Sequence, residues 1–527
     1  GDCFRRTEAS LQSYLDRCTQ ILEAQEIKPL LTGILPTIAK TDLRMECMTP
    51  SPRYWALNDI LRSLRGSDFS LHMRGTDELN VVHDSILFEA CNTSFQTHLQ
   101  IHPQEFVAAY NWAQTIAGPI LAIAVNSPLL LGRELWQESR IALFQQSIDL
   151  RSSSRALKEQ AARVSFGDQW AQGSIADIFQ HNLAQFPVIV AKEIEESALE
   201  SLRAGKIPKL EALSVYNGTV YQWNRACYGR GGGKAHVRIE NRYLPAGPSL
   251  ADEVANFALW VGLMQARPTN GESAPQRHDF RQVKNNFIKA ARLGKEALLH
   301  WEGQLYRPVE LLEQKLLPLA EVGLKSVGVN PEDIQRYLGI IADRGRGQNG
   351  AEWTLHNYRR LKRRHKTDHA LNALTEAMYE RQQSGEPVHR WPVINVKHYR
   401  APRARRLGHV MSTQLFTMRE EDLAALAIRI MSWKKIHHLP VENQHGELTG
   451  LLTWRRLSQL PENSTATAAE IMRPHLITAR PEMPLEQAVE LMRKNEIGCL
   501  PVLQDQHLLG LVTRKDLIPL GYAFDRD

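Results

Sequence analysis

A repeated pattern in the last quarter of the chain constrains its fold more than any other feature. Three short patterns recur there with an offset of about sixty positions. They are Val-Met-Ser at 410 and Ile-Met-Arg at 471, His438-Leu-Pro-Val and Cys499-Leu-Pro-Val, and Gly450-Leu-Leu-Thr and Gly510-Leu-Val-Thr. Each copy contains an apolar strand, a turn and a second strand that leads into a helix. We therefore expect two copies of one small βα unit, packed together over residues 408–522.

The rest of the chain is long enough for further domains. A single hydrophobic core usually stops growing near ~250–300 residues, and this chain has 527. Its 43% hydrophobic and 23% charged residues are typical of an ordinary globular protein. We predict an N-terminal domain over residues 1–265, a helical extension and linker over 266–400, and then the repeat domain.

Charge and cysteine usage exclude several classes of protein. The formal net charge of +6 is small for this length, so we expect neither a polyanionic partner nor nucleic-acid binding. Because the six cysteines are scattered and form no CxxC pair, we interpret them as reduced thiols of a cytoplasmic protein. The most apolar run, residues 115–125, is shorter than the ~20 residues of a membrane helix, which indicates a buried helix and no membrane association.

Two predicted strands in the N-terminal domain alternate strictly between apolar and polar residues. In residues 93–103 and 235–245, one face of each strand packs and the other carries polar or charged groups. The polar faces contain Gln96, His98, Gln100 and His102 in the first strand, and His236, Arg238, Glu240 and Arg242 in the second. An ion-pair ladder on a solvated sheet surface would give the same pattern, so a purely structural role stays open.

The remaining pattern indicates an α+β domain. Apolar spacing predicts helices over 6–26, 106–125, 141–148 and 174–200 and from 252 onward, and a strand over 30–38 that Gly33 and Pro36 break. Residues 280–385 are almost wholly helical in pattern, and the basic stretch 397–406 resembles an interdomain linker.

Three further patterns have structural explanations. Gly345-x-Gly347-x-x-Gly350 matches a dinucleotide fingerprint by letter, but a helical pattern precedes it, which indicates an interhelical loop. The glycine run at 229–235 lacks phosphate-loop spacing and predicts a hairpin loop between two strands. The basic run at 358–366 is typical of a solvated helix face.

The repeat resembles the CBS family, in which tandem copies form an α/β (Bateman) module. The resemblance rests on the Leu-Pro-Val strands and on the Gly-x-x-Thr strands that lead into helices. In that family the Thr and an Asp three residues later bind the ribose hydroxyls of AMP, ADP or ATP. The second copy keeps both as Thr513 and Asp516, whereas the first has Thr453 but Arg456. The resemblance thus implies one competent adenine-nucleotide site and a homodimer through the CBS pair; a pair kept only for dimerisation is the alternative.

The N-terminal part resembles the glutamate–cysteine ligase-type carboxylate–amine ligases. Six separated segments occur in that family's order: LTGILPT, Pro52-Arg-Tyr, FQTHLQIH, VNSPLLLGR with ESRIALF, RIENRYLPAGP and FALWVGLM. The resemblance implies a glutamine-synthetase-like antiparallel sheet with flanking helices. It also implies ATP and Mg²⁺ as cofactors, and joining of glutamate or a glutamyl substrate to an amine acceptor through an acyl phosphate.

Site residues follow from the same resemblance. His98, Gln100 and Asn126 are expected to bind the substrate, and Arg140 matches the arginine that holds the substrate in the family. Glu240 and Arg242 match the family's Glu-x-Arg pair, which implies a metal ligand and a phosphate contact. Catalysis is thus assigned to Arg140, Glu240 and Arg242.

One departure from the family leaves two interpretations open. The family's first strand carries a Gly-x-Glu-x-Glu cluster that binds Mg²⁺, and this sequence contains no such cluster. Either the sequence begins inside the ligase domain, which its opening at GDCFRRTEAS favours, or part of the metal site has been lost. The first interpretation predicts a ligase regulated by nucleotide at the CBS pair, and the second a non-catalytic regulatory or scaffold protein with a nucleotide-sensing dimerisation module.

Overall fold

The computed structural model describes most of the chain as two separate units. The described residues are 1–43, 45–66, 69–83, 85–151, 162–194, 196–268, 273–396, 406–413, 415–444, 446–461, 464–504 and 506–524. The first unit contains residues 1–38, 43–364 and 371–396, and the second contains 39–42, 365–370 and 397–527. Nearly all of the predicted basic linker lies outside the described residues.

A three-stranded antiparallel sheet organises the polar residues of the first unit. Its order is β3 (Thr97–Ile101), β9 (Lys234–Asn241) and β8 (Asn224–Gly231). His98 lies opposite Glu240, and Gln100 lies opposite Arg238. The two alternating strands predicted from the sequence are therefore confirmed as neighbours, with their polar residues on the same face.

The glycine run forms the predicted hairpin loop. β8 and β9 pair up to Gly231 and Lys234, which leaves Gly232 and Gly233 as the two turn residues. Both have positive φ angles, 56° and 75°. Glycine adopts this conformation without a Cβ clash, and the right-handed twist of the flanking strands requires it in a two-residue turn.

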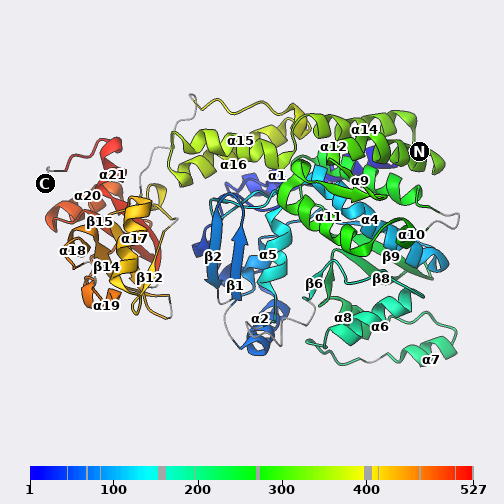
Figure 1. The fold of residues 1–527 in the computed structure, drawn as a ribbon, viewed down its shortest axis with the longest axis horizontal. Coiled ribbons are helices and arrows are strands. Elements are labelled where there is room, and N and C mark those ends of the chain that lie inside the picture. Colours follow the sequence, from blue (N-terminus) through cyan, green and yellow to red (C-terminus); the bar gives the residue numbers. More distant parts are fainter. Residues whose placement is uncertain are drawn as a thin grey trace. The chain divides into compact units, whose positions relative to one another are not determined.

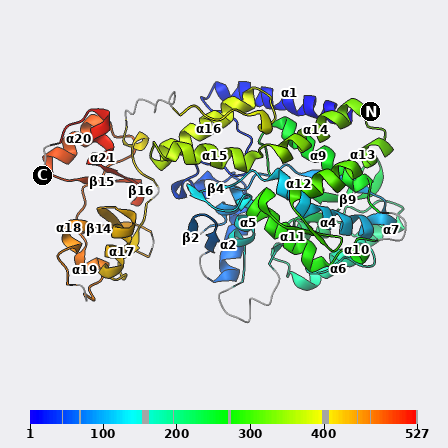
Figure 2. The same ribbon diagram turned by 45° about the horizontal axis from the view of Figure 1, so that its top comes forward.

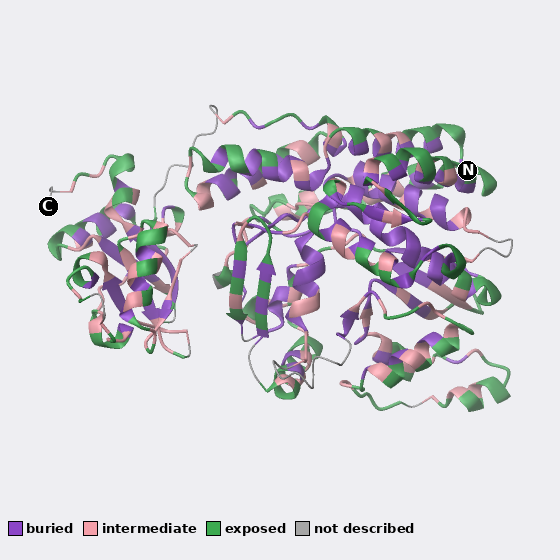
Figure 3. Ribbon diagram, in the orientation of Figure 1, coloured by how far each residue is buried: buried purple, intermediate pink, exposed green. Residues whose placement is uncertain are grey.

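Long helices pack together in the first unit and form its main core. Figure 1 shows α4 (Phe106–Ala124), α9 (Leu250–Gln265) and α11 (Phe280–Leu293) as neighbours, and nearly all of α4 is buried, as Figure 3 shows in purple. The predicted buried helix is thus confirmed. The side-chain amide of Asn224 donates to the Ala113 carbonyl of α4 at 3.2 Å, which ties the sheet to this helix layer.

Residues beyond 280 extend the same core. α14 (Pro331–Arg346), α15 (Gly350–Lys362) and α16 (Thr367–Gln383) confirm the helical prediction, interrupted by the short hairpin of β10 (Leu299–Trp301) and β11 (Gln304–Tyr306). Figure 2 shows these helices from a second direction. The residues between α14 and α15 form the predicted interhelical loop. Because buried side chains from 106–264 and 280–351 belong to one cluster, the helical extension and the sheet stabilise each other.

Shorter elements complete the first unit. They are α1 (Cys3–Glu23), α2 (Pro52–Arg65), β1 (Phe69–Arg74), β2 (Glu78–His83), α3 (Leu87–Ala90), β4 (Leu129–Leu130), β5 (Arg133–Glu134), α5 (Ser139–Ser147), β6 (Val164–Ser165), α6 (Ile175–Gln185), α7 (Ala198–Arg203), α8 (Glu211–Asn217), β7 (Tyr221–Gln222), α10 (Ala274–Arg277), α12 (Pro308–Leu311) and α13 (Leu317–Ser326).

Two local predictions are wrong. Residues 30–38 form bends and turns and no strand, and a Cβ on Gly33 would lie 3.0 Å from the Cβ of Ser127, so this segment packs closely against the 126–128 segment. The single helix predicted over 174–200 is two helices, α6 and α7. α6 ends at Gln185 because Phe186 precedes a proline, which disfavours helical backbone, and Phe186 is extended.

The second unit confirms the repeat. Its strands are β12 (Met418–Arg419), β13 (His438–Glu442) and β14 (Leu448–Thr453) in one sheet, and β15 (Cys499–Gln504) and β16 (His507–Thr513) in the other. Its helices are α17 (Ala424–Lys434), α18 (Trp454–Leu457), α19 (Ala468–Ile471), α20 (Leu485–Lys494) and α21 (Arg514–Leu517). The segments that lead into the two copies cross over, since Ser412 bridges to Leu511 and Arg473 bridges to Leu451.

Crossing over explains the two glycines of the repeat. A Cβ on Gly450 would lie 2.2 Å from the Met472 sulfur, and one on Gly510 would lie 2.8 Å from the Met411 sulfur. The glycine of each Gly-x-x-Thr strand thus leaves room for a methionine from the segment that leads into the other copy. The two copies therefore pack together as one module. Within the described parts of both units, no helix is long and apolar enough to cross a membrane.

Candidate functional site

Glu240 is the centre of the polar face of the sheet. Its Oε2 accepts a hydrogen bond from Arg225 Nε at 2.5 Å, and the Cys227 sulfur lies 3.5 Å from the same oxygen. Its Oε1 lies 3.8 Å from His98 Nε2 and 3.9 Å from Arg242 Nε. Three different strands or strand ends therefore bring basic groups to one buried carboxylate.

Arg242 is the group on this face whose bonding is least satisfied. Its side chain is 13% exposed, and its Nε and Nη1 atoms are buried without a hydrogen-bond acceptor among the residues that the structure describes. A guanidinium carries five N–H donors and normally satisfies them with carboxylate, phosphate or carbonyl oxygens. The open donors of Arg242 are therefore suited to an anionic ligand.

A cavity of about 450 Å³ opens beside this cluster. Its charged lining consists of Lys209, Arg225, Arg230 and Arg238, and Cys227 also lines it. Arg238 Nε donates to His98 Nδ1 at 3.1 Å, so the cavity wall contacts the predicted substrate residue. His98, Glu240 and Arg242 do not line the cavity but lie against residues that do.

The electrostatics of the face favour an ionised Glu240 and a neutral His98. Burial opposes ionisation of Glu240, but the charges of Arg225 and Arg242 hold its pKa below the usual range. Burial is the main cause that lowers the pKa of His98, and the neighbouring arginines lower it further. The Glu240 charge acts in the opposite direction, but the pKa stays below its usual value. Burial raises the pKa of the Cys227 thiol to about 11, so this cysteine is protonated near neutral pH.

The charge of the face suits an anion better than an isolated metal ion. Within the described ranges no cluster of three or more His, Cys, Asp or Glu side chains could hold a metal. Mg²⁺ commonly binds through one or two carboxylates together with substrate phosphates. Glu240 fits that mode, although Arg225 already engages one of its oxygens.

The sequence-predicted residues separate into two groups. His98, Gln100, Glu240 and Arg242 lie on or next to the polar face of the sheet, with Gln100 opposite Arg238. Arg140 and Asn126 lie elsewhere, in a buried network around Glu138.

The Glu138 network is fully enclosed. Arg140 is 1% exposed; its Nε donates to Glu138 Oε1 at 2.8 Å, and its Nη2 donates to the Tyr243 carbonyl. The Asn126 backbone N–H donates to Glu138 Oε2 at 2.7 Å, and the Asn126 side chain donates to the Ala246 carbonyl at 2.7 Å. These contacts hold the strand end after Asn241 against α5, so the substrate roles of Arg140 and Asn126 stay predictions.

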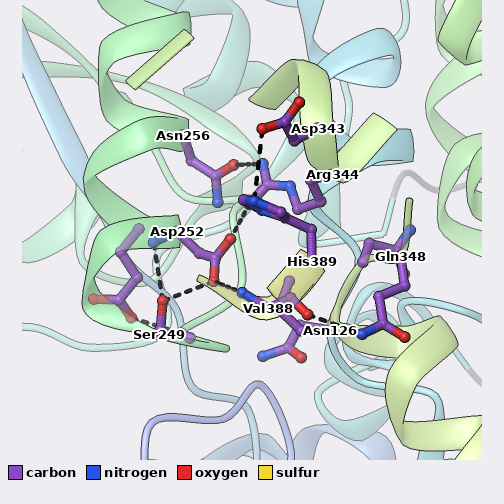
Figure 4. A network of polar contacts seen from close by, with 12 residues as sticks. Asn126, Ser249, Asp252, Asn256, Asp343, Arg344, Gln348, Val388 and His389 are labelled. Carbon is purple, nitrogen blue, oxygen red and sulfur yellow. Dashed lines mark hydrogen bonds and ion pairs between the residues drawn. The ribbon is translucent and has the colours of Figure 1, made fainter. Parts of the chain in front are cut away.

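A second enclosed network joins α9, α14 and the segment after α16, and Figure 4 shows it. Asp252 accepts from Arg344 Nη1 at 3.2 Å, from Ser249 Oγ at 2.7 Å and from the Val388 backbone N–H at 2.9 Å. Arg344 also donates to Asn256. The hydrogen bond from the Val388 N–H anchors the segment after α16 to this network.

The sequence-based prediction missed Arg225 and Cys227. Both lie on β8, where Arg225 pairs opposite Glu240 and Cys227 opposite Arg238. The alternation that identified β9 also runs through β8, and the predicted hairpin would have placed these residues on the same face. The pairing of residues across the predicted hairpin could therefore have identified Arg225 and Cys227 from the sequence.

The two repeat copies differ at the positions where CBS modules bind ribose. In the second copy, Asp516 Oδ2 accepts from the Thr513 hydroxyl at 2.8 Å and from the Thr513 N–H at 2.7 Å, while Asp516 Oδ1 forms an ion pair with Lys366. In the first copy, Arg456 Nη1 donates to the Met472 carbonyl at 3.3 Å, and Thr453 precedes α18. The structure thus brings Thr513 and Asp516 together, whereas Arg456 contacts the Met472 carbonyl.

Comparison with known proteins identifies both parts of the chain. Residues 2–377 match the Glutamate-cysteine ligase family 2 (GCS2), and residues 407–461 and 468–520 match the CBS domain. A CBS domain-containing protein of Dictyostelium discoideum is 33% identical over 126 residues, which cover 21% of this chain and 87% of that protein. A homoserine O-acetyltransferase of Methanohalobium evestigatum is 34% identical over 119 residues, which cover 22% of this chain and 24% of that protein.

Among solved structures, one similar chain is the CBS domain pair of a protein in complex with 5′-methylthioadenosine and S-adenosyl-L-methionine. It is 28% identical, covers 22% of this chain and 94% of that chain, and has a TM-score of 0.21. This chain spans about a quarter of the length of the homoserine O-acetyltransferase relative. The family match covers more than half of the residues, and the chain therefore belongs to the glutamate-cysteine ligase family 2, with a C-terminal pair of CBS domains.

Proposed function

We propose that the protein is an ATP-dependent carboxylate–amine ligase that forms a glutamyl amide bond through an acyl phosphate. The observation that carries this proposal is the open, buried guanidinium of Arg242 beside Glu240 and an arginine-lined cavity. Family membership supports the reaction class, and the antiparallel order β3, β9, β8 fits the expected glutamine-synthetase-like sheet.

Acyl phosphate formation requires stabilisation of negative charge on the transferring phosphoryl group. Arg242 and Arg225 are suited to this because they are partly desolvated and fixed by their neighbours before any ligand arrives. Mg²⁺, when bound with the nucleotide, supplies further charge neutralisation on the phosphate oxygens. His98, which is neutral near pH 7, is suited to hydrogen-bond the glutamate substrate or the acceptor amine.

For the CBS pair we propose regulation by an adenine nucleotide. Asp516 is a carboxylate with two acceptor oxygens next to the Thr513 hydroxyl, and such a group suits the two hydroxyls of a ribose. Arg456 lacks acceptors, so the first copy is not expected to bind ribose in the same way. Dimerisation through the CBS pair and a cytoplasmic location belong to the same proposal.

A second candidate is a non-catalytic regulatory or scaffold protein. The observation that favours it is the 2.5 Å contact between Arg225 and Glu240, which places a cation where a ligase would hold a metal ion. In that case the arginine face would bind an anionic ligand without phosphoryl transfer.

A ligase assay on the full chain separates the two candidates. We expect phosphate release from ATP that requires glutamate and Mg²⁺, with hydroxylamine as a small acceptor that traps the acyl phosphate. Arg242→Met should reduce this rate by ~100-fold or more with little change in unfolding. Arg390→Met is the matched control, because Arg390 is exposed and forms its ion pair with Glu386 four residues earlier. ATP binding without any glutamate-dependent turnover would support the scaffold candidate.

A further inference from the structure

Lys366 contacts the carboxylate that the proposed nucleotide site requires. It forms an ion pair with Asp516 Oδ1, the oxygen that the Thr513 hydroxyl does not use. The side chain of Lys366 is 42% exposed, whereas that of Asp516 is 5% exposed. Asp516 is therefore already covered by a group from outside the repeat.

A second contact holds the same turn in place. Asp368 accepts from the Thr413 backbone N–H at 3.1 Å and from the Thr413 hydroxyl at 3.0 Å. Thr413 follows Ser412, which bridges to Leu511 of β16, so this entry segment lies beside the second Gly-x-x-Thr strand. Residues 365–370 accordingly belong to the second unit, although they precede the repeat by about forty positions. Two independent side chains, Lys366 and Asp368, thus fix one turn over the strand that ends at Thr513.

The first copy shows a related arrangement with a different origin. There Arg456 replaces the carboxylate, and its guanidinium contacts the Met472 carbonyl of the crossing entry segment. A cation thus occupies the ribose position in both copies. In the first copy the cation is part of the repeat and is permanent, but in the second it comes from a separate turn and can leave.

We propose that Lys366 is an internal competitor for the second CBS site, so that adenine-nucleotide binding and the Lys366–Asp516 ion pair exclude each other. The inference rests on the proposed nucleotide binding at Thr513 and Asp516. Ribose hydroxyls donate to Asp516 and need the oxygen that Lys366 covers. Nucleotide binding therefore releases Lys366 from Asp516.

Titration of the full chain with AMP, ADP and ATP without Mg²⁺ tests the competition. Lys366→Met keeps the aliphatic stem and removes the charge, so we expect nucleotide affinity to rise by ~3- to 10-fold, the effect of removing a competing ion pair of ordinary strength. Lys362→Met is the control, since Lys362 is exposed and its ammonium lies over the Tyr358 ring, and the affinity of this variant should match the wild type. Unchanged or weaker binding by Lys366→Met overturns the inference.

A labelling experiment keeps this inference distinguishable from nucleotide sensing itself. Under limiting amine acetylation, saturating nucleotide should increase modification of Lys366 by ~3-fold or more relative to Lys362, because the displaced amine no longer lies against Asp516 and is open to the reagent. If nucleotide binds and Asp516→Ala abolishes binding, but Lys366 labelling does not rise, the competition is wrong and the sensor stands. If neither the wild type nor Lys366→Met binds any nucleotide, the sensor and the competition both fail.

Discussion

Two arginine–glutamate arrangements in the ligase unit use the same chemistry in opposite ways. Around Glu138, the Arg140 guanidinium, the Ser127 hydroxyl and the Asn126 N–H satisfy both carboxylate oxygens inside the core. Around Glu240, the guanidinium of Arg242 keeps buried donors without acceptors in the described structure, and a cavity adjoins the cluster. The closed arrangement holds both oxygens of its carboxylate in protein contacts, whereas the guanidinium of the open one has donors left for a ligand.

The difference shows that residue type and segment order do not by themselves locate a site. Arg140 and Arg242 both match arginines of the ligase family, but only Arg242 shares its carboxylate partner, Glu240, with the cavity-lining Arg225. Bonding that is left unsatisfied is the more direct sign of a binding role, because a buried donor without a partner costs free energy unless a ligand supplies one.

The largest expected effect is on the closed arrangement. Arg140→Met should lower the free energy of unfolding by about 3–5 kcal/mol, because it leaves the buried Glu138 carboxylate without its cation. Chemical denaturation of the full chain measures this change. The double variant Glu138→Gln with Arg140→Met removes both charges and should recover part of the loss. If Arg140→Met stayed stable but lost glutamate binding, Arg140 would belong to the site.

Glu253 is a third buried carboxyl of this unit, and unlike Glu138 and Glu240 it has no basic partner among the described residues. Burial, with a smaller contribution from the Asp252 charge, raises its pKa to about 7, although the hydrogen bond from the Gly247 N–H acts in the opposite direction. Between the unfolded value near ~4.5 and 7, the folded state holds a proton that the unfolded state has lost, so stability falls as the pH rises through this range. Above pH 7 the full penalty, on the order of 2–3 kcal/mol, applies.

Glu253→Gln tests this sign. Glutamine keeps an acceptor for the Gly247 N–H, which the carboxylate accepts at 2.6 Å, but carries no charge. The variant should match the wild type near pH 5 and be more stable by on the order of 2 kcal/mol at pH 8, as measured by denaturation across this range. A wild-type stability that does not fall between pH 5 and 8 relative to the variant would contradict the assignment.

The open arrangement should respond more in binding than in stability. Arg225→Met removes the cation closest to Glu240, so the pKa of Glu240 should rise and ATP affinity should fall by about tenfold. The unfolding free energy should fall by only about 1–2 kcal/mol, because Arg225 is 21% exposed and other cations remain near Glu240. Titration and denaturation of the same variant measure both. A stability loss as large as that of Arg140→Met, with unchanged ATP affinity, would make the face a structural ladder.

The sequence predicted local patterns better than their relations in space. Period-two alternation located β3 and β9 and their polar faces, and the repeat located the CBS pair, because both signals are written in neighbouring residues. The enclosure of Arg140 depends on its contact with Tyr243, about a hundred positions later in the chain. The position of Arg225 depends on its contact with Glu240, fifteen positions later. Likewise, the basic run at 358–366 was expected on one helix face, yet α15 ends at Lys362 and Lys366 reaches Asp516.

The smallest expected effect is that of Arg456, in the first copy of the CBS pair. Arg456 is exposed and donates a hydrogen bond to the Met472 carbonyl at 3.3 Å, so it is neither enclosed like Arg140 nor left with buried donors like Arg242. Arg456→Ala should change adenine-nucleotide affinity by no more than about twofold, which corresponds to less than ~0.5 kcal/mol. Asp516→Ala should abolish binding in the same titration, because no other carboxylate of the repeat occupies the ribose position. Equal losses from the two variants would mean that the first copy also binds nucleotide, with Arg456 on a phosphate.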